Sequence, residues 1–308
     1  MRNLFRKIPL LAFACFTSAV QAATFLLPAE DQNLVGEMIY ITAKRSDTFV
    51  DIAQAYGIGY DELVLANPDV DPWLPKNGAR ILLPTRYVLP DVPREGIVLN
   101  VPEMRLYYFP KPQGDESAKV VTYPVSIGRY DWKTPIGNTS IVTKAANPAW
   151  RPPESIRKEH AADGDYLPTF VPPGPDNPLG KFALRLGLPG YLIHGTNRPS
   201  GIGMRVTHGC IRLYPDDIQT LFNNVDVGTQ VNIVHQPYKL GWNKGILYLE
   251  AHPPFDEDRE TQRADLEPLI DSLYELRNEG MDDNVDFRAA LRYARQPRGI
   301  PIAVSTKS

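Results

Sequence analysis

Proline limits how this chain can fold more than any other residue, because 30 of its 308 residues are proline. Ordinary usage is about 5%, so the proline content is nearly doubled. Each proline fixes φ and lacks a backbone N–H, which disfavours helix interiors and favours turns and extended segments. The chain is therefore not expected to be a helical bundle. Its 43% of hydrophobic residues can bury a core, and its length suggests about two domains.

The N-terminus has the pattern of a secretory signal peptide over residues 1–22. Positive residues come first, an apolar run follows from Ile8 to about Phe16, and small residues precede position 23. This run is shorter than the roughly 20 residues of a membrane-spanning helix, and no other segment is long and apolar enough. The alternatives are a buried N-terminal helix and a lipoprotein signal ending at Cys15. The second fits poorly, because bulky Phe13 stands where a small residue is expected.

Charge and composition exclude several kinds of partner. The formal net charge is −3, and loss of the three positive residues of the signal peptide would lower it to about −6. No lysine- or arginine-rich block stands out beyond the first few residues, which argues against nucleic acid. His160, His235 and His252 lack partners at metal-ligand spacing, and no glycine-rich phosphate loop is present. We therefore expect neither a metal nor a cofactor.

Export would leave a single cysteine, Cys210, within the sequence THGCIRL. A lone cysteine cannot form an intramolecular disulfide, so it is either buried and inert or exposed and used. His208 and Arg212 flank it, and Gly209 permits unusual dihedrals and close approach of a substrate. A nucleophilic thiolate needs a proton acceptor and oxyanion donors. His194, in YLIHGT, and the N–H groups of Gly209 and Cys210 could supply them, so we interpret Cys210 as a nucleophile.

Residues 38–84 form a first unit with the predicted order strand, helix, helix, strand. The helices are expected to begin at caps formed by Ser46 or Asp47 and by Asp61. This unit resembles a LysM module, a small α+β fold that binds glycans containing N-acetylglucosamine. A small spacer without a ligand is the alternative. The resemblance rests on Tyr40, Asp47-Thr48, Ile52-Ala53, Tyr56-Gly57, Leu63, Asn67-Pro68 and Ile81-Leu82-Leu83-Pro84.

The rest of the chain divides into three parts. Residues 84–96 are predicted to be a proline-spaced linker, and residues 96–236 a β-rich unit with one clear helix capped by Asp216. Within this unit a long proline-rich loop is expected over 146–180, which at that length is functional or disordered. Residues 237–308 contain a predicted hairpin and two amphipathic helical segments. We interpret this partly helical C-terminal extension as a packing appendage.

The motifs of the β-rich unit resemble the active-site signature of the L,D-transpeptidases, which have a YkuD-type catalytic domain. They are His194-Gly195-Thr196, then THGCIRL after a short spacer, with TPIG at 134–137 and PPGPDNPLG at 172–180. Together with the LysM-like unit, they are similar to periplasmic enzymes of enterobacterial type over about residues 24–240. The resemblance implies a mainly β, sandwich-like catalytic domain over 96–236. Its active site would lie at one end of the β layer, under the long proline-rich loop.

The resemblance also implies a mechanism and a location, the periplasm of a Gram-negative bacterium. Cys210 would attack the carbonyl at the L-centre of the third residue of a peptidoglycan tetrapeptide stem. The terminal D-alanine would leave, and an amine would resolve the thioester. His194 maps to the general acid/base. Gly195 or Thr196 would orient this imidazole through the backbone.

Two residue roles and the acceptor stay open at this stage. His208 either shapes the site or is a structural histidine, and Arg212 either holds a substrate carboxylate or braces the loop. The acceptor is a diamino-acid side chain on a second stem, which gives a 3→3 cross-link, or the C-terminal lysine of an outer-membrane lipoprotein. Water as acceptor would make the protein an L,D-carboxypeptidase or a lipoprotein-releasing hydrolase.

Two other classes compete with a transpeptidase. One is a LysM wall-binding protein with a degenerate catalytic domain, which the intact His194, His208 and Cys210 argue against. The other is a cysteine endopeptidase of the NlpC type. In that class the cysteine usually precedes the histidine in the chain, whereas here His194 comes first.

Overall fold

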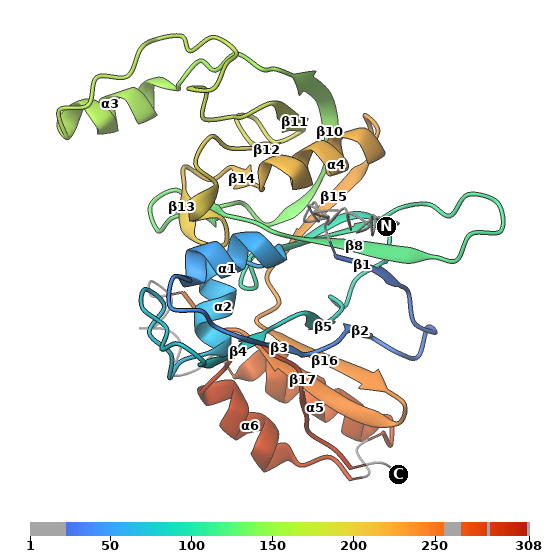
Figure 1. Cartoon of the computed structure of the whole chain (residues 1–308). Helices are drawn as coiled ribbons and strands as arrows, with labels where there is room; N and C mark the ends of the chain where they lie inside the picture. The colour runs from blue at the N-terminus through green and yellow to red at the C-terminus, as the bar shows by residue number, and fades with distance from the viewer. Residues whose placement is uncertain (1–22, 256–265, 282–283, 307–308) are drawn as a thin grey trace, which may run out of the picture.

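The computed structural model describes residues 23–255, 266–281 and 284–306, so the predicted signal peptide lies outside it. The described chain forms a small α+β unit, a large sheet with helices, and a second α+β unit at the C-terminal end (Figure 1). Over these residues, no helix has the length and apolar character needed to cross a membrane.

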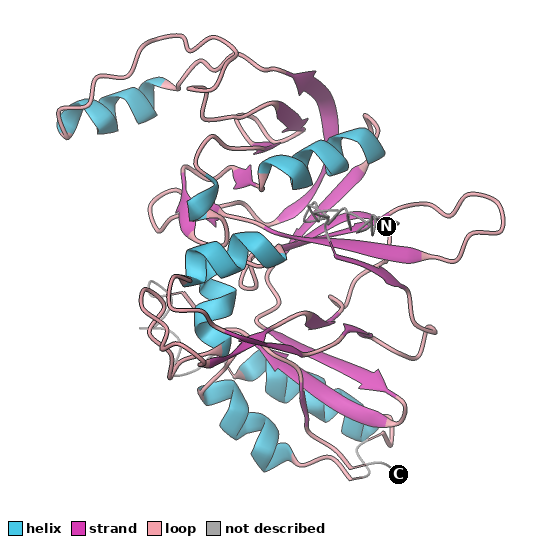
Figure 2. Ribbon diagram, viewed as in Figure 1, coloured by secondary structure: helices cyan, strands magenta, loops and turns pink. Residues whose placement is uncertain are grey.

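Nine strands form the central sheet, in the order β1-β8-β7-β6-β15-β10-β11-β12-β14. Neighbouring strands are antiparallel except for the β6–β15 and β12–β14 pairs, which are parallel. Figure 2 shows the strand direction changing strongly across the sheet, as the twist of β-structure requires. The mainly β prediction is confirmed. The strands are β1 (Ala23–Leu26), β6 (Gly96–Asn100), β7 (Arg105–Phe109), β8 (Lys119–Pro124), β10 (Gly137–Ala146), β11 (Phe182–Leu186), β12 (Leu192–His194), β14 (Ile211–Arg212) and β15 (Gln230–Val234).

Side chains of β6 alternate between two cores on opposite faces of this sheet. Ile97 and Leu99 pack into the larger core, which helix α4 (Pro215–Asn224) covers, whereas Val98 faces a smaller one. Because both faces are buried, Ile97, Val98 and Leu99 are all apolar and do not alternate with polar residues. The prediction that Asp216 caps α4 is wrong. Tyr214 is the N-cap and proline occupies the first turn, where its missing N–H costs nothing.

The first unit has the predicted order of elements, but its helix caps differ. Thr48, not Ser46 or Asp47, begins the first helix, because Thr48 and the residue three positions later form a capping box. Gly59, not Asp61, begins the second. The elements are β3 (Ile39–Thr42), α1 (Phe49–Tyr56), α2 (Tyr60–Ala66) and β4 (Arg80–Leu83).

The segment 84–96 is packed, so its prediction as a linker is wrong. Its strand β5 (Arg86–Val88) pairs with β2 (Leu34–Gly36), and Tyr87 and Leu89 are buried against the smaller core of the central sheet. The prolines here limit the length of the strand. The prolines do not prevent the segment 84–96 from packing against the rest of the protein.

The segment 146–180 contains a helix, α3 (Glu154–Ala162), so it is not wholly a loop as predicted. Figure 1 shows α3 on a long connection at the top left of the molecule. Ile156 is the single buried side chain of this helix. The consecutive prolines before Glu154 suit a helix start, because proline is tolerated where N–H groups have no helical partner.

The first unit packs directly against the segment that leads into THGCIRL. The backbone N–H groups of Tyr60 and Asp61 each donate to a carbonyl 3.1 Å away, those of Ile202 and Gly203. Gly203 has φ of 82°, and a Cβ added there would lie 2.3 Å from the Cα of Gly59. Only glycine allows this approach. The α+β unit therefore packs closely against the segment before Cys210 and is not a loosely tethered module.

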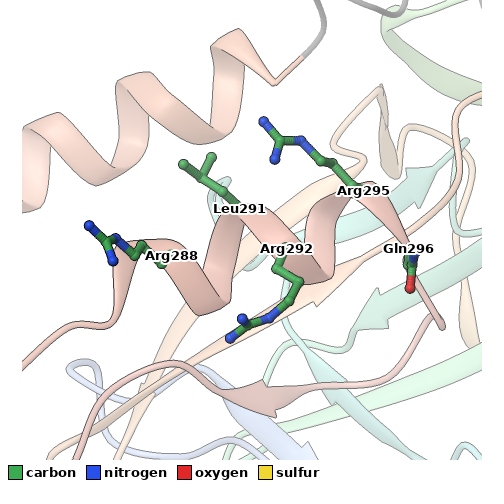
Figure 3. Close-up of a pocket in the computed structure, with 5 residues that line it drawn as sticks. All are labelled: Arg288, Leu291, Arg292, Arg295 and Gln296. Atoms are coloured by element: carbon green, nitrogen blue, oxygen red, sulfur yellow. The ribbon is translucent and has the colours of Figure 1, made fainter.

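The C-terminal extension contains the predicted hairpin and two helices. Its helix α6 presents Arg288, Arg292 and Arg295 around a surface hollow of about 390 Å³ that Leu291 also lines (Figure 3). None of these residues belongs to the central sheet. The elements are β16 (Tyr238–Asn243), β17 (Ile246–Ala251), α5 (Glu267–Asn278), α6 (Phe287–Arg295) and β18 (Ile302–Ala303).

A buried lysine joins the C-terminal extension to the rest of the molecule. Lys239 Nζ lies 2.8 Å from Glu103 Oε2 and 2.9 Å from Glu250 Oε1, and it donates to Val88 O at 2.7 Å. Glu103, Glu250 and His252 place ligand atoms within 4.8 Å of one another, a spacing that would suit a metal ion. The ammonium group already contacts both carboxylates, so we assign this cluster as an internal ion-pair network and not as a metal site.

Candidate active site

Two adjacent parallel strands bring the sequence motifs together. β12 ends at His194 and β14 begins directly after Cys210, with His194 paired in register with Arg212. His194-Gly195-Thr196 and THGCIRL therefore lie side by side at one edge of the central sheet. Although β14 has only two residues, it holds the two motifs together because its partner β12 is fixed in the core through Ile193.

Gly209 gives the loop before Cys210 its shape. Its φ is 95°, and an added Cβ would lie 2.8 Å from the Tyr191 ring, so a larger residue would be strained and crowded. Thr134, from the TPIG element, donates to Gly209 O at 2.9 Å and accepts from Gly128 N at 3.0 Å. The hydroxyl of Thr134 therefore links the loop before Cys210 to the backbone at Gly128.

The Cys210 thiol is partly buried, and its Sγ lies 3.7 Å from Gly190 O. Burial raises the pKa of the thiol above its ordinary value, although a hydrogen bond with the Leu192 backbone and the charge of Arg212 act in the opposite direction. The resting cysteine is therefore a neutral thiol at neutral pH. A base must remove its proton before it can act as a nucleophile.

His194 is a buried, neutral imidazole. Its Nδ1 lies 2.6 Å from Gly195 O, so we assign the Nδ1–H tautomer. Burial and the charge of Arg212 lower the pKa of His194 to about 3, against the effect of hydrogen bonds to the Gly195 and Leu179 backbone. A neutral imidazole can accept a proton, and the same backbone groups would stabilise the imidazolium that results.

In the part of the chain that the structure describes, no hydrogen bond joins Cys210 Sγ to the His194 ring. Both groups are neutral, so the resting site is not a preformed thiolate–imidazolium pair. Catalytic hydrogen bonds often tighten only when substrate binds.

Arg212 and Thr196 border the same strand edge. Arg212 Nε is buried without a hydrogen-bond partner among the described residues, and burial lowers the pKa of this guanidinium. A planar guanidinium with an unused donor is suited to a carboxylate. The Thr196 hydroxyl instead accepts from the Arg198 N–H at 2.9 Å, which shapes the turn after His194.

Sequence patterns did not reveal the surroundings of His208. Arg129, Trp132 and Glu159 contact or approach its ring, and they come from the turn after strand β9 (Ile127–Gly128) and from α3. No spacing in the sequence relates these residues to THGCIRL. The sequence signal that came nearest to indicating the surroundings of His208 was TPIG, which resembles a family element and lies just after Trp132.

The pKa of Cys210 leads to a prediction for its chemical reactivity. Alkylation of the thiol by iodoacetamide should accelerate about tenfold per pH unit from about pH 6 to pH 8, because the thiolate fraction rises in that proportion below the pKa. No plateau is expected in this range, since burial raises the pKa. Mass spectrometry of quenched samples would give the rates. A plateau below pH 7 would instead indicate a preformed thiolate.

Comparison with known proteins agrees with this arrangement of motifs. Residues 94–233 match the family model YkuD, the L,D-transpeptidase catalytic domain. An Escherichia coli protein named "Probable L,D-transpeptidase ErfK/SrfK" is 40% identical over 302 residues, which are 97% of this chain and 95% of that protein. The chain belongs to the L,D-transpeptidase family. Two further Escherichia coli proteins, named "Probable L,D-transpeptidase YcfS" and "Probable L,D-transpeptidase YbiS", are also similar. YcfS is 44% identical over 80% of this chain and 80% of that protein, and YbiS is 42% identical over 78% of each.

Likeness to solved structures is much lower than likeness in sequence to these L,D-transpeptidases. An L,D-transpeptidase from Mycobacterium smegmatis matches with a TM-score of 0.35 and 19% identity, over 51% of this chain and 63% of that chain. The family assignment rests on the identity to full-length relatives, which extends through the first unit and the C-terminal extension as well as the catalytic unit.

Proposed function

We propose that this L,D-transpeptidase acts in the periplasm on peptidoglycan tetrapeptide stems through a thioester on Cys210. The pairing of His194-Gly195-Thr196 with THGCIRL on two adjacent strands carries the proposal. His194 takes the thiol proton, and Sγ attacks the carbonyl of the third stem residue. The C–N bond to D-alanine breaks, and His194 returns the proton to the leaving amine.

An amine acceptor then attacks the thioester carbonyl, gives its proton to His194 and regenerates the thiol. A diamino-acid side chain on a second stem as acceptor gives a 3→3 cross-link, and a lipoprotein lysine gives an anchor for the outer membrane. Arg212, with its unused Nε donor, is the candidate for holding a substrate carboxylate. No described residue distinguishes between these two acceptors.

Intact-protein mass spectrometry tests the first half of this proposal. Residues 23–308 are incubated with a disaccharide-tetrapeptide, and a mass gain of the donor minus D-alanine is expected. Folded protein that has a free thiol but neither gains this mass nor releases D-alanine would contradict the proposal. It would favour a wall-binding protein. Supplying a second stem or a lipoprotein C-terminal peptide then identifies the acceptor.

We also propose that residues 38–84 are a LysM module that binds the glycan. The aromatic side chains of Trp73 and Tyr56 are exposed, and the Trp73 ring contacts the Tyr60 ring in a tilted arrangement with a centroid distance of 5.9 Å. Trp73→Ala should weaken sedimentation with purified peptidoglycan by up to about tenfold, because an aromatic contact contributes roughly 0.5–1.5 kcal/mol. Acylation of the soluble donor should be unchanged. Unaltered sedimentation would favour the spacer interpretation.

A further inference from the structure

Segments far apart in the sequence hold the ring of His208. Glu159 Oε2 and Arg129 Nη1 each lie 3.2 Å from its Nε2, and the Trp132 ring meets it edge-on at a centroid distance of 5.1 Å. His160 lies at 6.0 Å. His208 directly precedes Gly209 and Cys210. Any group that fixes this ring therefore also restrains the loop that carries the nucleophile.

The two contacts at His208 Nε2 cannot both be hydrogen bonds, because a neutral ring nitrogen either donates or accepts. Arg129 also pairs with the Glu159 carboxylate and, through Nε at 2.8 Å, with Asp131. The consistent assignment is that Nε2–H donates to Glu159 and that Arg129 donates to the carboxylates. This assignment leaves Nδ1 as the acceptor of the ring.

The Glu159 carboxylate is itself held in place. Trp132 Nε1 donates to its Oε2 at 3.1 Å, and Arg129 pairs with its other oxygen. Although partial burial acts against it, the hydrogen bond and the charge of Arg129 and the hydrogen bond from Trp132 lower the pKa of Glu159. The group is therefore an ionised acceptor at neutral pH, and a charged acceptor makes the stronger hydrogen bond.

We propose that Glu159 is a positioning residue for the catalytic loop. Its carboxylate, carried on α3, fixes the orientation and the Nε2–H tautomer of His208 and so holds Gly209 and Cys210 in the conformation that receives the donor stem. The helix within the 146–180 segment thereby becomes part of the active site, although it contributes no group to the chemistry. The kinetic part of this proposal rests on the proposed function, whereas the tautomer part does not.

The Glu159→Gln variant tests the proposal by two independent measurements. Nitrogen-15 NMR of the histidine rings should show His208 as the Nε2–H tautomer in the parent and as a mixture in the variant. The rate of acyl-enzyme formation with the tetrapeptide donor should fall about tenfold, since a charge-assisted hydrogen bond is lost. Glu159→Asp, which retains the charge on a shorter side chain, should recover part of the tautomer preference.

Glu154→Gln is the matched control. It makes the same chemical change on the same helix, at an exposed residue whose ion pair is with Lys158 at 2.8 Å. Neither the tautomer nor the rate should change in this variant.

A parent-like tautomer in Glu159→Gln would overturn the proposal, as would an equal loss of rate in Glu154→Gln, which would indicate a general effect of α3. A parent enzyme that forms no acyl-enzyme would contradict the proposed function instead. In that case the NMR measurement would still decide whether Glu159 positions His208.

Discussion

The Cys210→Ala variant is expected to form no covalent adduct with a tetrapeptide donor and to release D-alanine at least about 10⁴-fold more slowly than the parent. In the proposed mechanism Sγ forms the bond to the donor carbonyl, and no other described side chain at the strand edge is a comparable nucleophile. Intact-protein mass spectrometry and a D-alanine assay measure the two effects.

The fold of this variant should remain intact. Cys210 is partly buried, and its contact with Gly190 O, at 3.7 Å, is weak. Removing one sulfur atom at such a position should therefore change the free energy of unfolding by about 1 kcal/mol. Cys210→Ser is a useful companion, because its hydroxyl has nearly the same shape but ionises far less readily. Turnover of the donor by folded Cys210→Ala protein would rule out the cysteine mechanism.

The catalytic strand edge was predictable from the sequence, because its main residues lie in two short motifs with local geometry. Gly209 illustrates this, since its φ of 95° requires glycine whatever surrounds it. The contacts of Glu159 and Arg129 with His208 were not predictable. They depend on how α3 and the turn after β9 pack in three dimensions, and no local pattern encodes that packing.

The missed and misplaced elements each have a physical cause. Only Ile156 is buried in α3, so the helix lacks the apolar periodicity by which helices are recognised, and nearby prolines suggested a loop. In β5, tertiary burial of Tyr87 outweighed the prolines on either side. The cap of α1 was misplaced because serine, threonine and aspartate are all acceptable caps, and only the completed turn selects among them. The caps of α2 and α4 were misplaced because Gly59 and Tyr214 make no side-chain capping hydrogen bond that a sequence pattern would indicate.

The largest loss of stability is expected for Lys239→Met. The side chains of Lys239, Glu103 and Glu250 are each 1% exposed. Removal of the ammonium group would leave two buried carboxylates close together without the cation that both contact, which costs about 3–5 kcal/mol. Thermal unfolding at neutral pH should therefore show a fall in Tm of the order of 10 °C.

The dependence of this loss on pH distinguishes lost charge from lost packing. In the parent, Lys239 and His252 overcome the effect of burial and lower the pKa of Glu250 to about 2. The contribution of Glu250 to stability is thus present above its unfolded pKa and is lost as the pH falls toward 2. Without Lys239, burial raises the pKa of Glu250, so protonation in mild acid relieves the buried charge. The difference in Tm between parent and variant should therefore shrink from pH 7 to about pH 4.

Lys158→Met is the control for this experiment. It removes an equally charged side chain from an ion pair with Glu154 whose two side chains are 75% and 68% exposed. Solvent screens such a pair, so the change in the free energy of unfolding should stay below about 0.5 kcal/mol at every pH. If Lys239→Met lost the same stability at pH 4 as at pH 7, the lysine would contribute through packing of its aliphatic chain. If instead Lys239→Met lost its full stability only at neutral pH, the C-terminal extension would be held to the catalytic unit by charge.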